Sequence, residues 1–157
     1  MTNPPNDSAA AFPVETLARV LDLLIPPSTD GRLPGAGELG LSRYVEELLA
    51  KTPAPRPLVA QGLAALEAAA SGRGARGFAE LPRDAQRALL DAHAKTAPAF
   101  APTLLFLVMT GYYREPRVLA ALGLENRPPF PKGHAVEESD FSLLDAVRRR
   151  EKLYREC

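Results

Sequence analysis

The sequence predicts an all-α protein, a compact bundle of about six or seven short helices with proline-rich connecting loops. Apolar residues recur at helical spacing in one segment after another. No segment alternates apolar and polar residues as a half-buried strand would. The 16 prolines among 157 residues keep the helices short, because proline is excluded from helix interiors. Apolar residues make up 46% of the chain, which is enough for a folded core.

The first helix is expected directly after a flexible N-terminal tail, residues 1–12, which is rich in Asn, Pro, Ser and Ala. Pro13 suits a first helical turn, and Pro26 ends the helix because proline disfavours the helical conformation of the residue before it. The apolar stripe between them comprises Leu17, Val20, Leu21 and Leu24. Residues 28–40 follow with four glycines, which is typical of a loop.

The second and third helices lie on either side of a proline-broken linker at residues 51–57. The apolar stripe of the second helix comprises Leu41, Tyr44, Val45, Leu48 and Leu49, and the inner face of the third comprises Leu58, Gly62, Leu63, Leu66 and Ala70. Residues 71–77 (SGRGARG) then form a flexible, basic connector. A fourth helix begins near Pro82 and contains Asp84, Ala85, Leu89 and Ala92.

The fifth helix is the most apolar part of the chain. It begins near Pro98 and Pro102 and runs through Met109. Because it is apolar nearly all round, we expect it at the centre of the domain. Pro116 then opens a short sixth helix that ends at Gly123.

The C-terminal segment is expected to be extended at first and helical at its end. Residues 127–134 (RPPFPKGH) are typical of a polyproline-like conformation. Ser139 or Asp140 can cap a last helix, whose apolar residues are Phe141, Leu144 and Val147. Basic residues follow near the end of this helix, where they complement its dipole. We expect a single helical domain over residues 13–157.

The totals of the chain exclude several classes of protein. Lys and Arg together number 19, as do Asp and Glu, so we expect no nucleic-acid partner. No window of ~18 uninterrupted apolar residues occurs, so we expect no membrane span. Cys157 is the one cysteine, which leaves no internal disulfide and no Cys/His zinc pattern. No export signal is visible before Arg19, and both a cytoplasmic and a periplasmic location stay open.

The sequence contains no recognisable catalytic motif. His93 and His134 are the two histidines, and neither has a motif partner that would make it a general base. No Gly-x-Ser-x-Gly turn is present. The glycines of residues 71–77 follow a predicted helix and lack the Lys-Ser or Lys-Thr of a phosphate-binding loop. We therefore expect no catalytic, cofactor-binding or metal-binding residue in this chain.

The end of the fifth helix, MTGYYREPRV, has the composition of a contact surface. Tyr112 and Tyr113 cannot both point inward, so we expect one in the core with its hydroxyl at the rim and the other exposed or half exposed. Large aromatic residues with a polar tip are favoured at protein interfaces. The candidate interface residues are Tyr112, Tyr113, Arg114, Pro116, Phe130 and His134. The residues leave open whether these segments face a partner or pack on this protein's own helices.

The order of the motifs resembles one known family. LLIPP is followed by LPGAGELGL, then by FAELPRDAQRALL, then by GYYREPRVLAALG and finally by PPFPKGH. This succession resembles the gluconate 2-dehydrogenase subunit 3 family over roughly residues 14–155. The most specific part is the pattern GYY-x-[DE]-P-x-V, at residues 111–118.

The resemblance implies a non-catalytic small subunit. Members accompany large flavoprotein dehydrogenases of the glucose-methanol-choline type, which carry FAD and oxidise sugars, sugar acids or related alcohols. Electrons often leave through a cytochrome c subunit, which holds haem. The small subunit is thought to support the maturation, stability and export of the flavoprotein. Many members begin with a twin-arginine signal, which is not visible in this chain.

Two other functions stay open from the sequence. The chain could be a free-standing helical adaptor or regulatory protein that binds another protein partner, with the basic C-terminal helix as the recognition element. An independent enzyme is the third hypothesis, and the absence of a catalytic motif argues against it. For the subunit hypothesis we expect FAD in the partner, haem in any third subunit, and neither cofactor in this chain.

Overall fold

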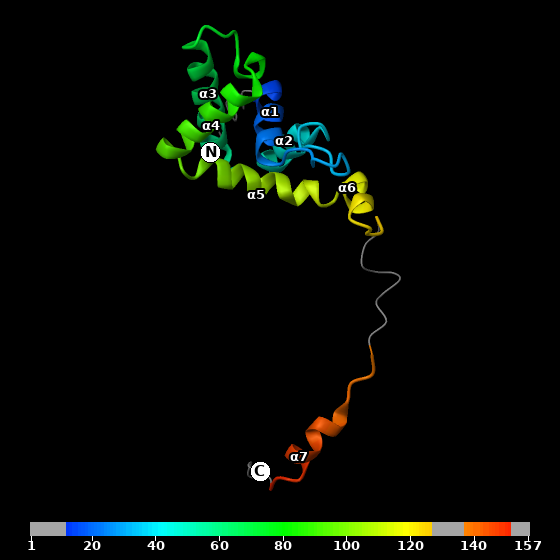
Figure 1. The fold of residues 1–157 in the computed structure, drawn as a ribbon. Coiled ribbons are helices and arrows are strands. Elements are labelled where there is room, and N and C mark those ends of the chain that lie inside the picture. Colours follow the sequence, from blue (N-terminus) through cyan, green and yellow to red (C-terminus); the bar gives the residue numbers. More distant parts are fainter. Residues whose placement is uncertain (1–11, 127–136, 152–157) are drawn as a thin grey trace, which may run out of the picture. The chain divides into compact units, whose positions relative to one another are not determined.

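The computed structural model describes residues 12–126 and 137–151, and it confirms the all-α prediction (Figure 1). The helices are α1 (Val14–Leu24), α2 (Leu41–Lys51), α3 (Arg56–Ser71), the 3-10 turn η1 (Phe78–Glu80), α4 (Arg83–Thr96), α5 (Phe100–Tyr112), α6 (Pro116–Ala121), the 3-10 turn η2 (Phe141–Leu144) and α7 (Asp145–Arg148). No strand occurs in these described residues.

The chain divides into two compact units, residues 1–126 and residues 127–157. The first unit contains α1 to α6 and the hydrophobic core, and the second contains η2 and α7. The single domain expected over residues 13–157 stays a prediction. Phe12, which the sequence assigned to the tail, is buried, and the Arg56 guanidinium carbon lies 4.6 Å from the centre of its ring.

Helix α1 begins one residue later than a first-turn Pro13 would place it, with Pro13 as its N-cap and Leu17 N donating to Pro13 O at 2.9 Å. Its core side differs slightly from the prediction, because Leu23 is buried and Leu24 only half-buried. The last backbone carbonyls of α1 are satisfied from α4. Arg83 Nη2 donates to Asp22 O at 3.2 Å, and Arg87 Nη1 donates to Leu23 O at 3.1 Å. Two arginines thereby cap one helix from another.

The loop between α1 and α2 is held by a side chain of α1. Asp22 Oδ1 accepts a hydrogen bond from Gly37 N at 2.7 Å and a longer one from Glu38 N at 3.3 Å. A Cβ at Gly37 would lie 2.3 Å from the carbonyl oxygen of Ala18, so only glycine allows this approach. The predicted loop is therefore fixed to α1 at Gly37 and Glu38.

A carboxylate of α3 joins three elements of the first unit. Glu67 Oε1 accepts a hydrogen bond from Thr16 Oγ1 of α1. Glu67 Oε2 accepts one at 3.1 Å from Phe78 N, the first residue of η1. Burial of Thr16 shields its hydroxyl from water, and the Glu67 carboxylate gives it a partner.

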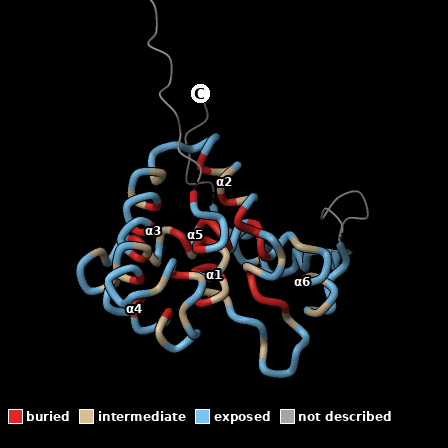
Figure 2. Tube along the Cα trace, turned by 90° about the horizontal axis from the view of Figure 1, so that it is seen from above, coloured by how far each residue is buried: buried red, intermediate tan, exposed pale blue. Residues whose placement is uncertain are grey.

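Helix α5 packs against α1, α2 and α3, and Figure 1 shows it along one side of the unit. Figure 2 shows that the buried residues gather in the middle of the unit, among these helices. The buried residues of α5 are Phe100, Leu104, Leu107, Val108, Gly111 and Tyr112. The prediction that α5 lies in the centre holds for this side alone, since Phe106 on the other side is 72% exposed.

The last helix is shorter than the sequence predicts. Asp140 is the cap, because its Oδ1 accepts a hydrogen bond from Ser142 N at 3.0 Å. The turn η2 follows, and α7 adds four residues. None of residues 137–151 is buried, and short helices without a packed face are marginal in water.

Candidate partner-binding surface

The end of α5 is fixed by a close contact with α2. Gly111 is buried, and a Cβ there would lie 2.6 Å from Cδ1 of the Tyr44 ring. The Tyr44 hydroxyl and Thr110 Oγ1 form a hydrogen bond at 3.0 Å. Pro116 then starts α6, since proline suits the first position of a helix.

Tyr112 belongs to the interior. It is 3% exposed, and its hydroxyl donates to the carbonyl oxygen of Pro34 at 3.0 Å. Burial raises the pKa of Tyr112 above its ordinary value, and the neighbouring Tyr113 adds to the shift. The hydroxyl was expected at the rim of the core. It lies instead between α5 and the loop of residues 25–40, and it joins the two.

Tyr113 belongs to the surface. Its side chain is 51% exposed, and its ring stands edge-on to the Tyr112 ring with the centroids 5.4 Å apart. Aromatic pairs prefer this perpendicular arrangement. A buried neighbour therefore orients the exposed ring.

An exposed apolar stripe runs along α5, which we call the α5 stripe and define as Phe106, Met109 and Tyr113. Phe106 and Met109 lie within α5 and Tyr113 directly follows its last residue, and spacings of three and four residues place all three on one side of the helix. Their exposed fractions are 72%, 40% and 51%, and α5 contains no charged residue. Aromatic residues and Met are enriched in protein interfaces, and exposed apolar patches mark binding surfaces.

Sequence reasoning missed Phe106 and Met109, although a signal was present. The run TLLFLVM has no polar face, so burying any side of it leaves apolar residues on the opposite side. We assigned the whole run to the core. The structure shows that the partners of α5 cover only one of its sides.

The six predicted interface residues are only partly brought together. Tyr113, Arg114 and Pro116 are exposed around the end of α5, whereas Tyr112 is buried beside them. Phe130 and His134 lie outside the described residues.

The neighbouring helix α6 is braced against the loop of residues 25–40. Arg117 Nη2 lies 3.1 Å from Glu38 Oε1, and Arg32 Nη2 donates to Ala121 O at 2.9 Å. Both contacts hold α6 next to the end of α5, where the predicted interface residues Arg114 and Pro116 lie.

The other polar groups give no reactive arrangement among residues 12–126 and 137–151. No three His, Cys, Asp or Glu side chains gather there as metal ligands. A hollow of ≈ 390 Å³ is lined by Glu15, Glu67 and Glu80. Glu67 already accepts two hydrogen bonds, and Glu80 lies 3.7 Å from Arg76.

No helix of the described segments has both the length and the apolar character to cross a bilayer.

The comparisons with known proteins gave one finding. A family model described as gluconate 2-dehydrogenase subunit 3 matches residues 13–131, which is more than half of the 157 residues. The matched range contains α1 to α6 and the whole α5 stripe. Searches of curated proteins and of solved structures gave no match.

Proposed function

This chain belongs to the gluconate 2-dehydrogenase subunit 3 family, and from that premise we propose that it is the non-catalytic small subunit of a dehydrogenase complex. Its partner is the large flavoprotein subunit, which carries FAD and oxidises a sugar, a sugar acid or a related alcohol. In complexes that pass their electrons to a cytochrome c, a third subunit holds the haem. The observation that carries the proposal is the family match over residues 13–131.

The α5 stripe supports a binding role. Phe106 of α5 and Tyr113 directly after it are each more than half exposed, while the other face of α5 is packed in the core. A partner that covers such side chains stabilises the complex by about 25 cal/mol for each Å² of apolar surface removed from water. The helix is already folded, so little conformational entropy is lost when a partner covers it.

We propose that the α5 stripe is the surface on which the large subunit docks, with Arg114 and Pro116 at its edge. The helix lacks charged residues, and a dry, apolar interface centre is where interface residues contribute most to affinity. A partner that binds only the folded form stabilises it by mass action. The same linkage acts on the large subunit, so the complex protects both proteins.

Co-expression tests this function directly. The large flavoprotein subunit is produced with and without this chain, and the yield of soluble, flavin-loaded enzyme and its dye-linked dehydrogenase activity are measured. We expect the two chains to co-purify and the yield of active enzyme to fall several-fold without this chain. Independent purification of the two proteins, with full activity of the large subunit alone, would contradict the proposal.

A matched pair of variants tests the surface. Phe106→Asp introduces a charge into the α5 stripe, and we expect it to weaken the complex at least about tenfold, as loss of an interface anchor does. Val14→Asp is the control, because Val14 is also an exposed apolar residue, 51% exposed, but belongs to α1 and lies outside the α5 stripe. Circular dichroism of both variants should match the unmodified protein. If both variants bind the large subunit with equal affinity, the α5 stripe is not the docking surface.

A further inference from the structure

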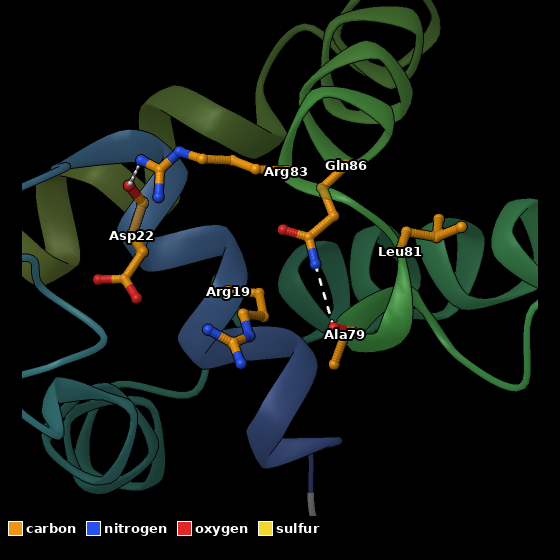
Figure 3. Close-up of a pocket in the computed structure, with 6 residues that line it drawn as sticks. All are labelled: Arg19, Asp22, Ala79, Leu81, Arg83 and Gln86. Carbon is orange, nitrogen blue, oxygen red and sulfur yellow. Dashed lines mark hydrogen bonds between the residues drawn. The ribbon is translucent and has the colours of Figure 1, made fainter.

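A second site lies where α1, η1 and the start of α4 meet (Figure 3). The cavity has a volume of ≈ 170 Å³, which is large enough for a small ion or for the tip of a side chain. Its lining residues are Arg19, Asp22, Ala79, Leu81, Arg83 and Gln86. We call this cavity the arginine pocket.

The arginine pocket has more hydrogen-bond donors than acceptors. Arg19 is exposed, and its guanidinium meets no acceptor in the described part of the chain. Arg83 gives one N–H to Asp22 O at 3.2 Å, which fixes its position and leaves its other donors for a ligand. Figure 3 shows the two guanidinium groups on different sides of the pocket, one from α1 and one from α4.

The pocket also contains one oriented acceptor, on the side chain of Gln86. This residue is only 5% exposed, and its Nε2 donates to Phe78 O at 3.1 Å and to Ala79 O at 3.3 Å. These two bonds fix the amide, so Oε1 turns into the space between Arg19 and Arg83 (Figure 3). Within the described residues no group donates to this oxygen.

The charge of the lining favours an anion. Asp22 is the one carboxylate, and its Oδ1 is engaged by Gly37 N and Glu38 N. No ion pair in the described residues joins Asp22 to Arg19 or Arg83. The pocket also lies at the N-terminus of the 14-residue helix α4, where the helix dipole favours negative charge.

We propose that the arginine pocket binds a small oxyanion that carries its own hydroxyl group, as a 2-hydroxycarboxylate or hydrogen phosphate does. The anionic oxygens accept hydrogen bonds from Arg19 and Arg83, and the hydroxyl donates to Gln86 Oε1. Guanidinium groups suit such planar or tetrahedral oxyanions. The site is formed entirely by this chain, so it needs no partner subunit.

A titration of the purified full-length protein tests the site. Two-dimensional NMR follows the Gln86 side-chain amide and the Arg19 Nε–H while glycolate, hydrogen phosphate or acetate is added at constant ionic strength, because salt screens surface charges. We expect saturable shifts of both signals with glycolate or phosphate and weaker binding of acetate, which has no hydroxyl. The tighter of the first two ligands identifies the natural class. Acetate that binds as tightly as glycolate, or shifts that never saturate, would overturn the proposal.

A matched pair of arginine variants completes the test. Arg19→Gln replaces the guanidinium by a shorter, neutral amide, and we expect it to weaken binding about tenfold or more, as loss of a charge-assisted hydrogen bond does. Arg73→Gln is the control, because Arg73 is an exposed arginine in the connector before η1 and does not line the pocket. Arg19→Lys should give intermediate affinity. Equal affinities of the Gln variants would show that the arginine pocket is not the binding site.

Discussion

Tyr112 and Tyr113 are neighbours in the chain, but Tyr112 is buried and Tyr113 is exposed. Tyr112 joins α5 to Pro34, and its ring holds the exposed Tyr113 ring in a fixed orientation. Adjacent helical residues point in different directions, so the sequence could show that the two roles differ. It could not assign them, because the choice depends on the loop that supplies the Pro34 carbonyl, far away in the sequence.

Tyr112→Phe should reduce stability, and the loss should depend on pH. At neutral pH we expect the free energy of unfolding to fall by about 1 kcal/mol, because the buried Pro34 carbonyl loses its donor. Burial raises the pKa of Tyr112, so its neutral form stabilises the folded state. That contribution is fully present below the unfolded-state pKa of about 10 and is lost as the pH rises through the higher folded-state pKa.

Urea unfolding at several pH values measures this prediction. The stability of the unmodified protein should fall more steeply above about pH 10 than that of Tyr112→Phe, because the variant lacks the buried phenol. If the free energy of unfolding falls equally steeply with pH for both proteins above about pH 10, Tyr112 is not shielded from water.

Removal of two buried hydroxyls should have different effects on the free energy of unfolding. Ser42 Oγ is buried in α2 without a hydrogen-bond partner in the described residues. Ser42→Ala should therefore leave the free energy of unfolding unchanged or raise it by up to about 1 kcal/mol. Thr16→Val removes the donor to Glu67 and should lower the free energy of unfolding by about 1–3 kcal/mol. Thermal denaturation compares the two, and a greater loss for Ser42→Ala would contradict the hydrogen-bond assignment.

The helical elements owe their positions to close approaches that glycine permits. Gly62 of α3 lies under the ring of Phe100, the first residue of α5, and a Cβ there would lie 2.1 Å from that ring. Both residues are buried, so the ring has no space into which it can move freely. The contact fixes the crossing of α3 and α5, and with it the side of α5 that faces outward.

Gly62→Ala should disturb this crossing. We expect the free energy of unfolding to fall by about 1–3 kcal/mol, as overpacking of a core does. Gly72→Ala is the control, because Gly72 has φ −62° and the nearest atom to a new Cβ, Ala68 O, lies 3.5 Å away. Its stability should be unchanged or slightly raised. Chemical denaturation of both variants gives the comparison, and equal effects would exclude the Phe100 contact as the cause.

The sequence predicts the helices of the first unit well, because prolines and apolar spacing act locally. Pro13, Pro82 and Pro116 each stand within a residue of a helix start. The turn η1 was missed, since three residues give no periodic signal. The length of the last helix was overestimated, because an apolar spacing promotes a helix only where a surface covers it.

At the scale of the whole molecule, α5 both supports the core and presents a surface. One side of it packs on three helices, and the other carries the α5 stripe. The sequence could indicate an interface near Tyr113, because aromatic composition is local information. It could not place Phe106 in that interface, since the side of an all-apolar helix that faces solvent is decided by contacts with distant helices.

Site-specific crosslinking tests the central claim most directly. A photoreactive benzoylphenylalanine replaces Phe106 or, as a control, Val14, in cells that also produce the large dehydrogenase subunit. Illumination should join the two chains from position 106 and leave them separate, or nearly so, from position 14. A crosslink from position 14 alone, or none from position 106 while the two chains still co-purify, would show that the large subunit binds elsewhere.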